Sequence, residues 1–357
     1  MIVTAKGWDS AGFRDHVQEA LDAFLDEQAA LLEPLGSDAS RLVAEARTSV
    51  SGGKRFRASF CYWGHRAVAP PADEHSLVRA CASLELLHAS ALVHDDLMDA
   101  SDTRRGRPAT HRAFETEHRA AGWRGDQEQY GAAAAILLGD LLLSWADELL
   151  RRCGLPITQV APALEVFDRC RSEVIAGQFL DVSVQARGHA DVEAAMTVLR
   201  YKSAKYSIER PLHVGAALAG AGPDTLAALT SFGLPLGEAF QLRDDLLGVF
   251  GDPATTGKPA GDDLVEGKRT VLVALALDAA PPADAELLDR SLGTRLTPPE
   301  ISRLRQVIED SGAHAQVEEV IGELARIAVA ALDEADVDAS AREVLCGLAA
   351  AVIQRMV

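Results

Sequence analysis

The sequence predicts an all-α protein, and two observations carry that prediction. Apolar residues recur at helical spacing through most of the chain, and the alternating β-branched runs typical of strands are nearly absent. The 357 residues are 48% hydrophobic, which is enough to bury a large core. No polar linker divides the chain, so we expect residues 1–357 to form a single domain with a core over about 20–350 and a short N-terminal extension.

The helices are expected in the following order. An amphipathic helix over 13–35 opens the chain, and another begins near Lys54. A long helix over about 73–100 ends at the polar segment 101–108. Further helices are expected at about 131–153, 160–187, 190–220 (bent at Pro211) and 224–250, followed by a loop over 251–268 and four or so helices over 270–357.

Composition excludes several classes of function. A net charge of −18 argues against nucleic acid or an anionic membrane as a bulk partner. The five cysteines are scattered and never form a CxxC pair, as is typical of a reducing cytoplasm. No secretory signal and no run of 18 apolar residues occur, so we expect a cytoplasmic protein without a membrane-spanning segment.

An Asp-rich segment, Asp95-Asp96-x-x-Asp99, interrupts an apolar helical stretch. Asp95 and Asp99 stand four residues apart, so they share a helix face at about 6 Å. Carboxylates held that close repel one another, and a hard divalent cation such as Mg²⁺ relieves the repulsion. The simpler alternative is a helix cap or a solvated helix end. His88 lies on the same face, seven residues and about two turns before Asp95.

Cationic residues surround this cluster in the sequence. Gly52-Gly53-Lys54 and Arg57 combine glycines with cations near a helix start, an arrangement that binds anions but is weak evidence alone. Arg104 and Arg105 follow the Asp cluster, and with metal-bound carboxylates they could hold a diphosphate. Lys202, Ser203 and Lys205 form a third polar group, for which a solvated helix face is an equal alternative.

A second acidic cluster, Asp244-Asp245, follows Gln241 on the helix expected over 224–250. Lys258 and Lys268 lie in the Gly- and Pro-containing loop after it. A loop with glycines and lysines beside a metal–diphosphate site is typical of a lid that closes over an anionic substrate.

Taken in order, these motifs resemble those of the trans-polyprenyl diphosphate synthases, all-α enzymes that elongate allylic diphosphates with isopentenyl diphosphate. The resemblance covers about residues 20–350. It rests on these residues: Gly52-Gly53-Lys54-Arg55, His88, Asp95-Asp96-x-x-Asp99, Arg104-Arg105-Gly106, Gly177-Gln178-x-x-Asp181, Lys202-Ser203, Gln241, Asp244-Asp245 and Gly257-Lys258.

The resemblance implies a helical bundle of the isoprenoid synthase type with a central active-site cavity, Mg²⁺ as cofactor and a homodimer. It also implies roles for individual residues. The metal ligands would be Asp95, Asp99 and Asp244, supported by Asp96, Asp245, Gln178 and Asp181. The allylic diphosphate would contact Arg104, Lys202 and Lys258; isopentenyl diphosphate would contact Lys54, Arg57, His88 and Arg105; Ser203 and Gln241 would line the developing allylic cation.

The chain departs from the family pattern at three positions. Ala58 replaces a proline, and Ser203 replaces the commoner threonine while keeping a hydroxyl group. Gly248 stands where the second cluster of the family carries a third Asp. Asp252, one turn further on, is the residue expected to compensate for that loss.

Product length is predicted from the helix beneath the first cluster. Ser90 and Ala91 are small and leave a path open, whereas Leu86 and Leu87, one turn further, would form a floor. We therefore expect geranylgeranyl diphosphate, with farnesyl or longer products as alternatives. Two other functions remain open: a class I terpene cyclase, which would need a different second metal motif, and a non-catalytic prenyltransferase subunit, which should have lost ligands or lysines.

Overall fold

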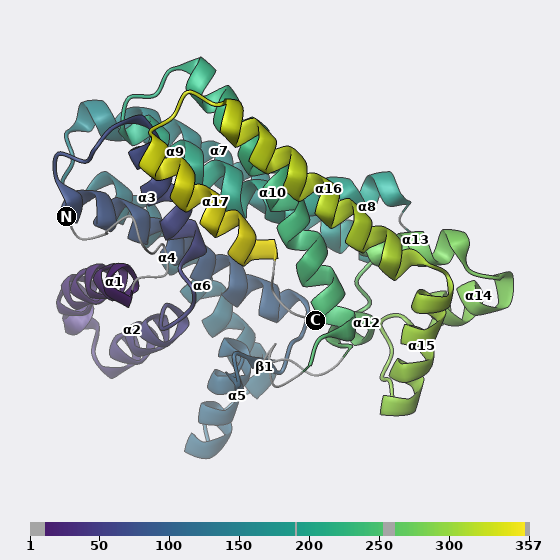
Figure 1. Cartoon of the computed structure of the whole chain (residues 1–357). Helices are drawn as coiled ribbons and strands as arrows, with labels where there is room; N and C mark the ends of the chain where they lie inside the picture. The colour runs from purple at the N-terminus through teal and green to yellow at the C-terminus, as the bar shows by residue number, and fades with distance from the viewer. Residues whose placement is uncertain (1–10, 190, 253–260, 354–357) are drawn as a thin grey trace.

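Helices build the protein in the computed structural model, which describes residues 11–189, 191–252 and 261–353 (Figure 1). In the first half of the chain they are α1 (Ala11–Leu32), a 3₁₀ turn (Glu33–Leu35), α2 (Ser37–Ser49), α3 (Phe56–Val68), α4 (Glu74–Met98), α5 (Thr110–Ala121), α6 (Gln127–Arg151) and α7 (Ile157–Arg187). In the second half they are α8 (Val192–Val198), a π-helical segment (Leu199–Glu209), α9 (Arg210–Leu218), α10 (Pro223–Phe250), α12 (Asp262–Glu266), α13 (Val271–Ala279), α14 (Pro282–Ser291), α15 (Pro298–Asp310), α16 (Ala313–Glu334) and α17 (Ala339–Ile353).

The all-α prediction is confirmed, and most long helices lie where the periodicity placed them. Two helices were not predicted, α2 and α5. Each buries few apolar side chains: α2 buries Val43 and Ala46, and the buried face of α5 is mostly polar, with Phe114 as its one large apolar residue. Both helices are amphipathic but mostly polar, so no apolar run marks them in the sequence.

Two predicted segments need correction. The segment 190–220 was expected to be one helix bent at Pro211. The backbone is helical without a break from Val192 to Leu218, but its middle part, Leu199–Glu209, is π-helical, and Pro211 follows directly after that part. The loop expected over 251–268 contains the short helix α12, and residues 253–260 of it lie outside the described residues.

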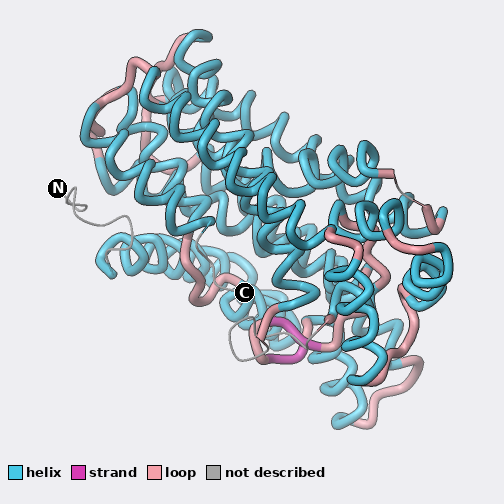
Figure 2. Tube along the Cα trace, turned by 45° about the vertical axis from the view of Figure 1, so that its right-hand side comes forward, coloured by secondary structure: helices cyan, strands magenta, loops and turns pink. Residues whose placement is uncertain are grey.

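A two-stranded hairpin is the other regular element among the described residues (Figure 2). Strands β1 (Thr103–Arg104) and β2 (Arg107–Pro108) pair antiparallel across the two-residue turn Arg105-Gly106. Both turn residues have positive φ, 52° and 73°, as a type I′ hairpin turn requires. Adjacent arginines in this hairpin therefore leave the backbone in different directions.

Helix α10 connects the two hydrophobic clusters of the protein and runs through the middle of the molecule (Figure 1). Its N-terminal half contributes Phe232 and Leu236 to the cluster shared with α3, α4, α6, α7 and α9. Its C-terminal half contributes Leu242 and Leu246 to the cluster shared with α13, α15 and α16. The second acidic cluster therefore lies on a helix that is fixed along its length.

Helix α4 is long and apolar enough, by length and composition, to cross a membrane. In the fold it is a core helix, because 78% of its most apolar stretch is buried inside the protein. The buried apolar residues of α4 fix the helix in the core, and the helix in turn holds His88 and the first Asp cluster in place.

Two glycines hold the π-helical segment close to its neighbours. A Cβ at Gly177 of α7 would lie 2.4 Å from the backbone nitrogen of Lys202, and a Cβ at Gly237 of α10 would lie 2.5 Å from the carbonyl oxygen of Ala204. Neither clash can be relieved by turning a flexible side chain. These positions set the distance of Lys202 from α7 and α10.

We predict that Gly177→Ala destabilises the protein by about 1–3 kcal/mol, the usual cost of overpacking a core. Urea unfolding followed by circular dichroism measures the change. Gly322→Ala on α16 is the matched control, because no atom lies within 4 Å of a Cβ there. The control should gain roughly 1 kcal/mol from the better helix propensity of alanine. Equal effects of the two substitutions would contradict the close approach.

Candidate functional site

The first acidic cluster ends α4, and other helices bring polar partners to it. Asp95 accepts hydrogen bonds from Lys202 Nζ and from Gln178 Nε2, each at 3.1 Å. Lys202 Nζ also donates to Asp181 Oδ2 at 2.6 Å. The structure thus joins α4, α7 and the π-helical segment through residues that the sequence placed at one site.

The two carboxylates that share a face of α4 differ in their ionisation. Burial opposes ionisation of Asp95, but Lys202, Lys268 and Arg104 outweigh it and hold the pKa of Asp95 well below its usual range. Burial and the charge of Asp95 raise the pKa of Asp99 to about 6. The pair therefore carries closely spaced negative charge that depends on nearby cations, as expected of a functional site.

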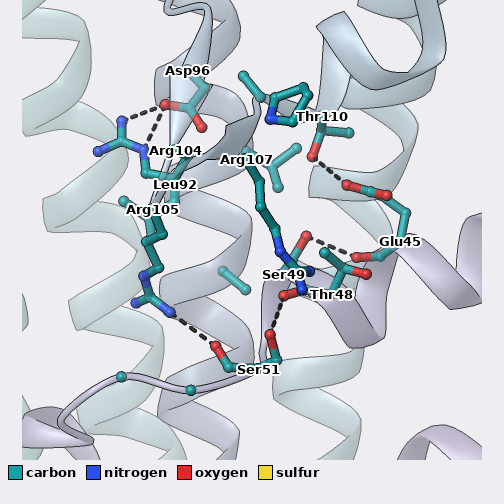
Figure 3. A pocket seen from close by; sticks show the side chains of 16 residues that line it. Glu45, Thr48, Ser49, Ser51, Leu92, Asp96, Arg104, Arg105, Arg107 and Thr110 are labelled. Carbon is teal, nitrogen blue, oxygen red and sulfur yellow. Dashed lines mark hydrogen bonds and ion pairs between the residues drawn. The ribbon is translucent and has the colours of Figure 1, made fainter. Parts of the chain in front are cut away.

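The hairpin after α4 directs two arginines to different targets (Figure 3). Arg104 Nε donates to Asp96 Oδ1 at 2.8 Å, and its Nη2 lies 3.7 Å from Asp95 Oδ2. Arg105 Nη1 donates to the carbonyl oxygen of Ser51 at 3.1 Å. Asp96 is buried, and its carboxylate pairs with Arg104. Arg104 therefore contacts two neighbouring carboxylates of the cluster.

A cavity of about 260 Å³ lies between the hairpin, α4 and the glycine-containing loop before α3. Its lining includes Gly52, Gly53 and three arginines, of which Arg107 was not singled out from the sequence although it follows Arg-Arg-Gly directly (Figure 3). A Cβ at Gly53 would lie 3.3 Å from the Arg105 guanidinium, and its φ is +91°. Only glycine suits both the backbone and the contact.

Tyr206 connects two residues that the sequence assigned to one anion site. The Arg57 guanidinium lies 4.2 Å from the centre of the Tyr206 ring, and His88 Nδ1 lies 2.5 Å from its hydroxyl oxygen. Arg57 Nη2 donates to Ser207 Oγ at 2.8 Å, while its buried Nε has no hydrogen-bond partner. Burial, reinforced by Arg57 and Arg105, lowers the pKa of His88. A lone tyrosine in a helix gave no signal in the sequence.

The start of the helix expected near Lys54 lies two residues later, which changes how Lys54 and Arg57 are arranged. Helix α3 begins at Phe56, so these two cations do not share a helical turn. Lys54 Nζ lies 5.9 Å from the centre of the Phe56 ring. Arg55 caps the helix with φ of 56° and turns inward, where it donates to Glu85 at 3.2 Å and to the carbonyl oxygen of Val50 at 2.6 Å.

The second acidic cluster is buried on α10. Gln241 Nε2 donates to Asp245 Oδ1 at 2.8 Å, whereas Asp244, on the same turn, is half-buried. Burial and the neighbouring Asp263 raise the pKa of Asp245 to about 8. Lys258 lies outside the described residues.

Lys268 connects the first cluster to α12. Its Nζ lies 3.4 Å from Asp99 Oδ2 and 3.5 Å from Asp263 Oδ1, and 2.6 Å from Glu266 Oε2. Its ammonium group is buried, and these carboxylates raise its pKa well above the usual value although burial alone would lower it. A buried cation therefore lies between carboxylates that come from distant parts of the sequence.

The donor set fits a hard divalent cation. All the acidic residues offer carboxylate oxygens, the ligands that Mg²⁺ prefers. The buried Asp99 Oδ2 accepts no hydrogen bond, and the charge beside it is the Lys268 ammonium at 3.4 Å. Within the described ranges no three acidic, His or Cys side chains are already grouped as metal ligands, because Lys202, Lys268 and Arg104 lie between them. Metal binding would require these cations to change partners.

The residues expected to set product length lie beneath the first cluster. Leu86 and Leu87 are buried in the core, as a floor would be. Ser90 is also buried, and its Oγ donates to the carbonyl oxygen of Gly139 on α6 at 2.7 Å. Ala91 is partly buried against the core. Ser203 is half-buried beside Lys202 in the π-helical segment.

Comparison with known proteins identifies the family of the chain. The sequence profile of the family described as polyprenyl synthetase matches residues 40–310. A geranylfarnesyl diphosphate synthase from Aeropyrum pernix is 33% identical over 266 residues, 74% of this chain and 77% of the relative. A short chain isoprenyl diphosphate synthase from Methanothermobacter thermautotrophicus is 32% identical over 317 residues, 88% of this chain and 90% of the relative.

A solved structure extends the similarity to nearly the whole chain. It is a geranylgeranyl pyrophosphate synthase from Corynebacterium glutamicum, complexed with isoprenyl diphosphate and magnesium. That protein is 41% identical, with a TM-score of 0.95 over 98% of this chain and 100% of the other. The chain belongs to the polyprenyl synthetase family.

Proposed function

We propose that the protein is a Mg²⁺-dependent trans-prenyltransferase that condenses isopentenyl diphosphate head-to-tail with an allylic diphosphate. The observation that carries this proposal is the presence of two cationic regions along α4, one beside Asp95 and one near His88, about two turns earlier. Lys202 and Arg104 lie beside Asp95 and Asp99. Arg57 and Arg105 lie toward His88 and the glycine-containing loop. Two separate anion sites suit a reaction that joins two diphosphate substrates.

The reaction breaks the allylic C–O bond, and the electron pair leaves with the diphosphate. Asp95, Asp99 and Asp244, with Asp96 and Asp245 in support, would hold Mg²⁺, and the bound ion would offset the charge of this leaving group. Lys202 and Arg104 would then donate hydrogen bonds to diphosphate oxygens instead of to Asp95, and Asp95 would be free to bind the metal ion. Lys258 is proposed to contact the same diphosphate.

The second substrate is proposed to bind near Arg57, Arg105, His88 and Lys54. Its alkene forms the new C–C bond, and the released diphosphate accepts the proton that is lost. The amide nitrogen of Gln241 donates to Asp245, which leaves its amide oxygen available for another contact. This oxygen and the Ser203 hydroxyl are proposed to stabilise the developing allylic cation. Exclusion of water is required, since water would trap the cation.

The alternatives are less well supported. A class I terpene cyclase uses one diphosphate, so the region around Arg57 and Arg105 would serve no purpose in it. A non-catalytic subunit has no reason to keep Asp95, Asp99 and Lys202 in one buried network. Relatives named as geranylgeranyl and geranylfarnesyl synthases support a product longer than farnesyl diphosphate, and we propose geranylgeranyl diphosphate.

The test is incubation with labelled isopentenyl diphosphate, Mg²⁺ and each allylic primer, followed by sizing of the products. We expect Mg²⁺-dependent formation of a twenty-carbon diphosphate. A cyclic hydrocarbon formed without consumption of isopentenyl diphosphate would favour the cyclase, and absence of any product would favour the non-catalytic subunit.

We also propose a homodimer. Large apolar side chains are exposed on two adjacent helices, where a second copy of the chain would bury them. On α6 they are Ile136 (48% exposed) and Leu137 (61%); on α7 they are Ile175 (56%) and Phe179 (70%). Sedimentation equilibrium should report twice the mass of the chain, and a monomer would contradict this proposal.

We predict that Asp95→Ala and Asp99→Ala each reduce turnover at least a hundredfold while the far-UV circular dichroism spectrum stays unchanged. The carboxylates serve a cation and not the apolar core, so their loss should spare the fold. Glu323→Ala, an exposed carboxylate on α16, is the control that should keep full activity. Inactivity accompanied by global unfolding would show a structural role instead.

Ala91→Phe should shorten the main product by at least one isoprene unit, because a large ring one turn below Asp95 would block the path of the growing chain. Ser90→Phe is expected to do the same. It is the less clean variant, because Ser90 packs against the Gly139 backbone and a ring there would also push on α6. Product sizing decides, and an unchanged product distribution for both variants would remove the basis of the length assignment.

A further inference from the structure

The second acidic cluster lacks a carboxylate at its third position, which is Gly248. A Cβ at Gly248 would lie 1.9 Å from Asp263 Oδ2 and 2.4 Å from Asp263 Cγ. The Asp263 carboxylate therefore lies in the space that a side chain at position 248 would need. Asp252, the residue expected from the sequence to compensate, is exposed after the end of α10.

Asp263 is held in this position by a well-anchored short helix. Its carbonyl oxygen accepts a hydrogen bond from the Lys268 backbone at 2.9 Å, and the next residue, Leu264, is fully buried. Gly267, with φ of +78°, packs against Gly293, where a Cβ would lie 2.8 Å from the Gly293 Cα. Asp263 itself is only 9% exposed.

The charges around Asp263 connect it to the first cluster. Lys268 Nζ lies 3.5 Å from Asp263 Oδ1 and 3.4 Å from Asp99 Oδ2, so one buried ammonium group faces carboxylates from α12 and α4. The Asp99 side chain is only 4% exposed, and its Oδ2 accepts no hydrogen bond. Lys268 is therefore the cation that offsets the burial of Asp99, and the same ammonium group faces Asp263.

We propose that Asp263 supplies, from α12, the third carboxylate that α10 lacks at Gly248, and so helps to hold the divalent cation and its diphosphate. The inference rests on the proposed function, and it assigns the missing ligand position to a different element of the fold. One consequence is structural: the second cluster is complete only while α12 is packed against α10.

An exchange of the carboxylate between the two positions tests the proposal. The variants are Asp263→Ala, Asp263→Asn, Gly248→Asp and the double variant Gly248→Asp/Asp263→Ala, all in the full chain. Calorimetric titration with methylene bisphosphonate, with and without Mg²⁺, measures Mg²⁺-dependent binding without relying on turnover. Circular dichroism checks that each variant is folded, and Asp263→Asn keeps the shape of the side chain.

Both Asp263 variants should weaken Mg²⁺-dependent bisphosphonate binding at least tenfold. Gly248→Asp alone should also weaken it, because two carboxylates would compete for one space. The double variant should recover most of the wild-type affinity, since the carboxylate returns on α10 and the clash is gone. A double variant no better than either single variant would overturn the proposal, as would wild-type affinity in Asp263→Asn.

Asp252→Ala separates the two candidate residues, and a larger loss for Asp252→Ala than for Asp263→Ala would also overturn the proposal. The wild-type protein distinguishes this inference from the proposed function. If it shows no Mg²⁺-dependent bisphosphonate binding, the proposed function fails together with the inference. If it binds normally and the Asp263 variants match it, only the inference fails.

Discussion

The site depends on one electrostatic constraint: carboxylates from two helices are buried close together and need positive charge to remain ionised. Asp95 and Asp99 on α4 and Asp245 on α10 lie in this region, and burial raises the pKa of the last two. The protein meets the demand with its own cations, chiefly Lys202 and Lys268. These cations can bind diphosphate oxygens equally well. A bound diphosphate can therefore take over the lysines while metal ions take over the carboxylates.

The fold supports this constraint through backbone contacts that need glycine. Gly177 and Gly237 let α7 and α10 approach the π-helical segment that carries Lys202. Gly248 leaves room for the Asp263 carboxylate. Because α10 belongs to both hydrophobic clusters, small movements of the second acidic cluster would disturb the core on both sides. The helices thus provide rigid positions for charges that repel one another.

The sequence predicted the long helices and the two acidic clusters because apolar periodicity and closely spaced carboxylates are local signals. It missed α2 and α5, which are mostly polar and bury few apolar residues, so no apolar run marks them. It also missed Tyr206 and Asp263, because their roles come from contacts with residues distant in the chain. The position of Gly248 was read from the family pattern, but the residue that fills its space is visible only in three dimensions.

The central claim is that the carboxylates are compensated by the protein's own cations until a diphosphate brings metal to them. Electron paramagnetic resonance of Mn²⁺, a substitute for Mg²⁺, tests it directly by measuring free metal. With protein alone, the signal of free Mn²⁺ should remain nearly unchanged; with an added bisphosphonate it should fall as the ions are bound. Tight Mn²⁺ binding without bisphosphonate, or none in its presence, would contradict the claim.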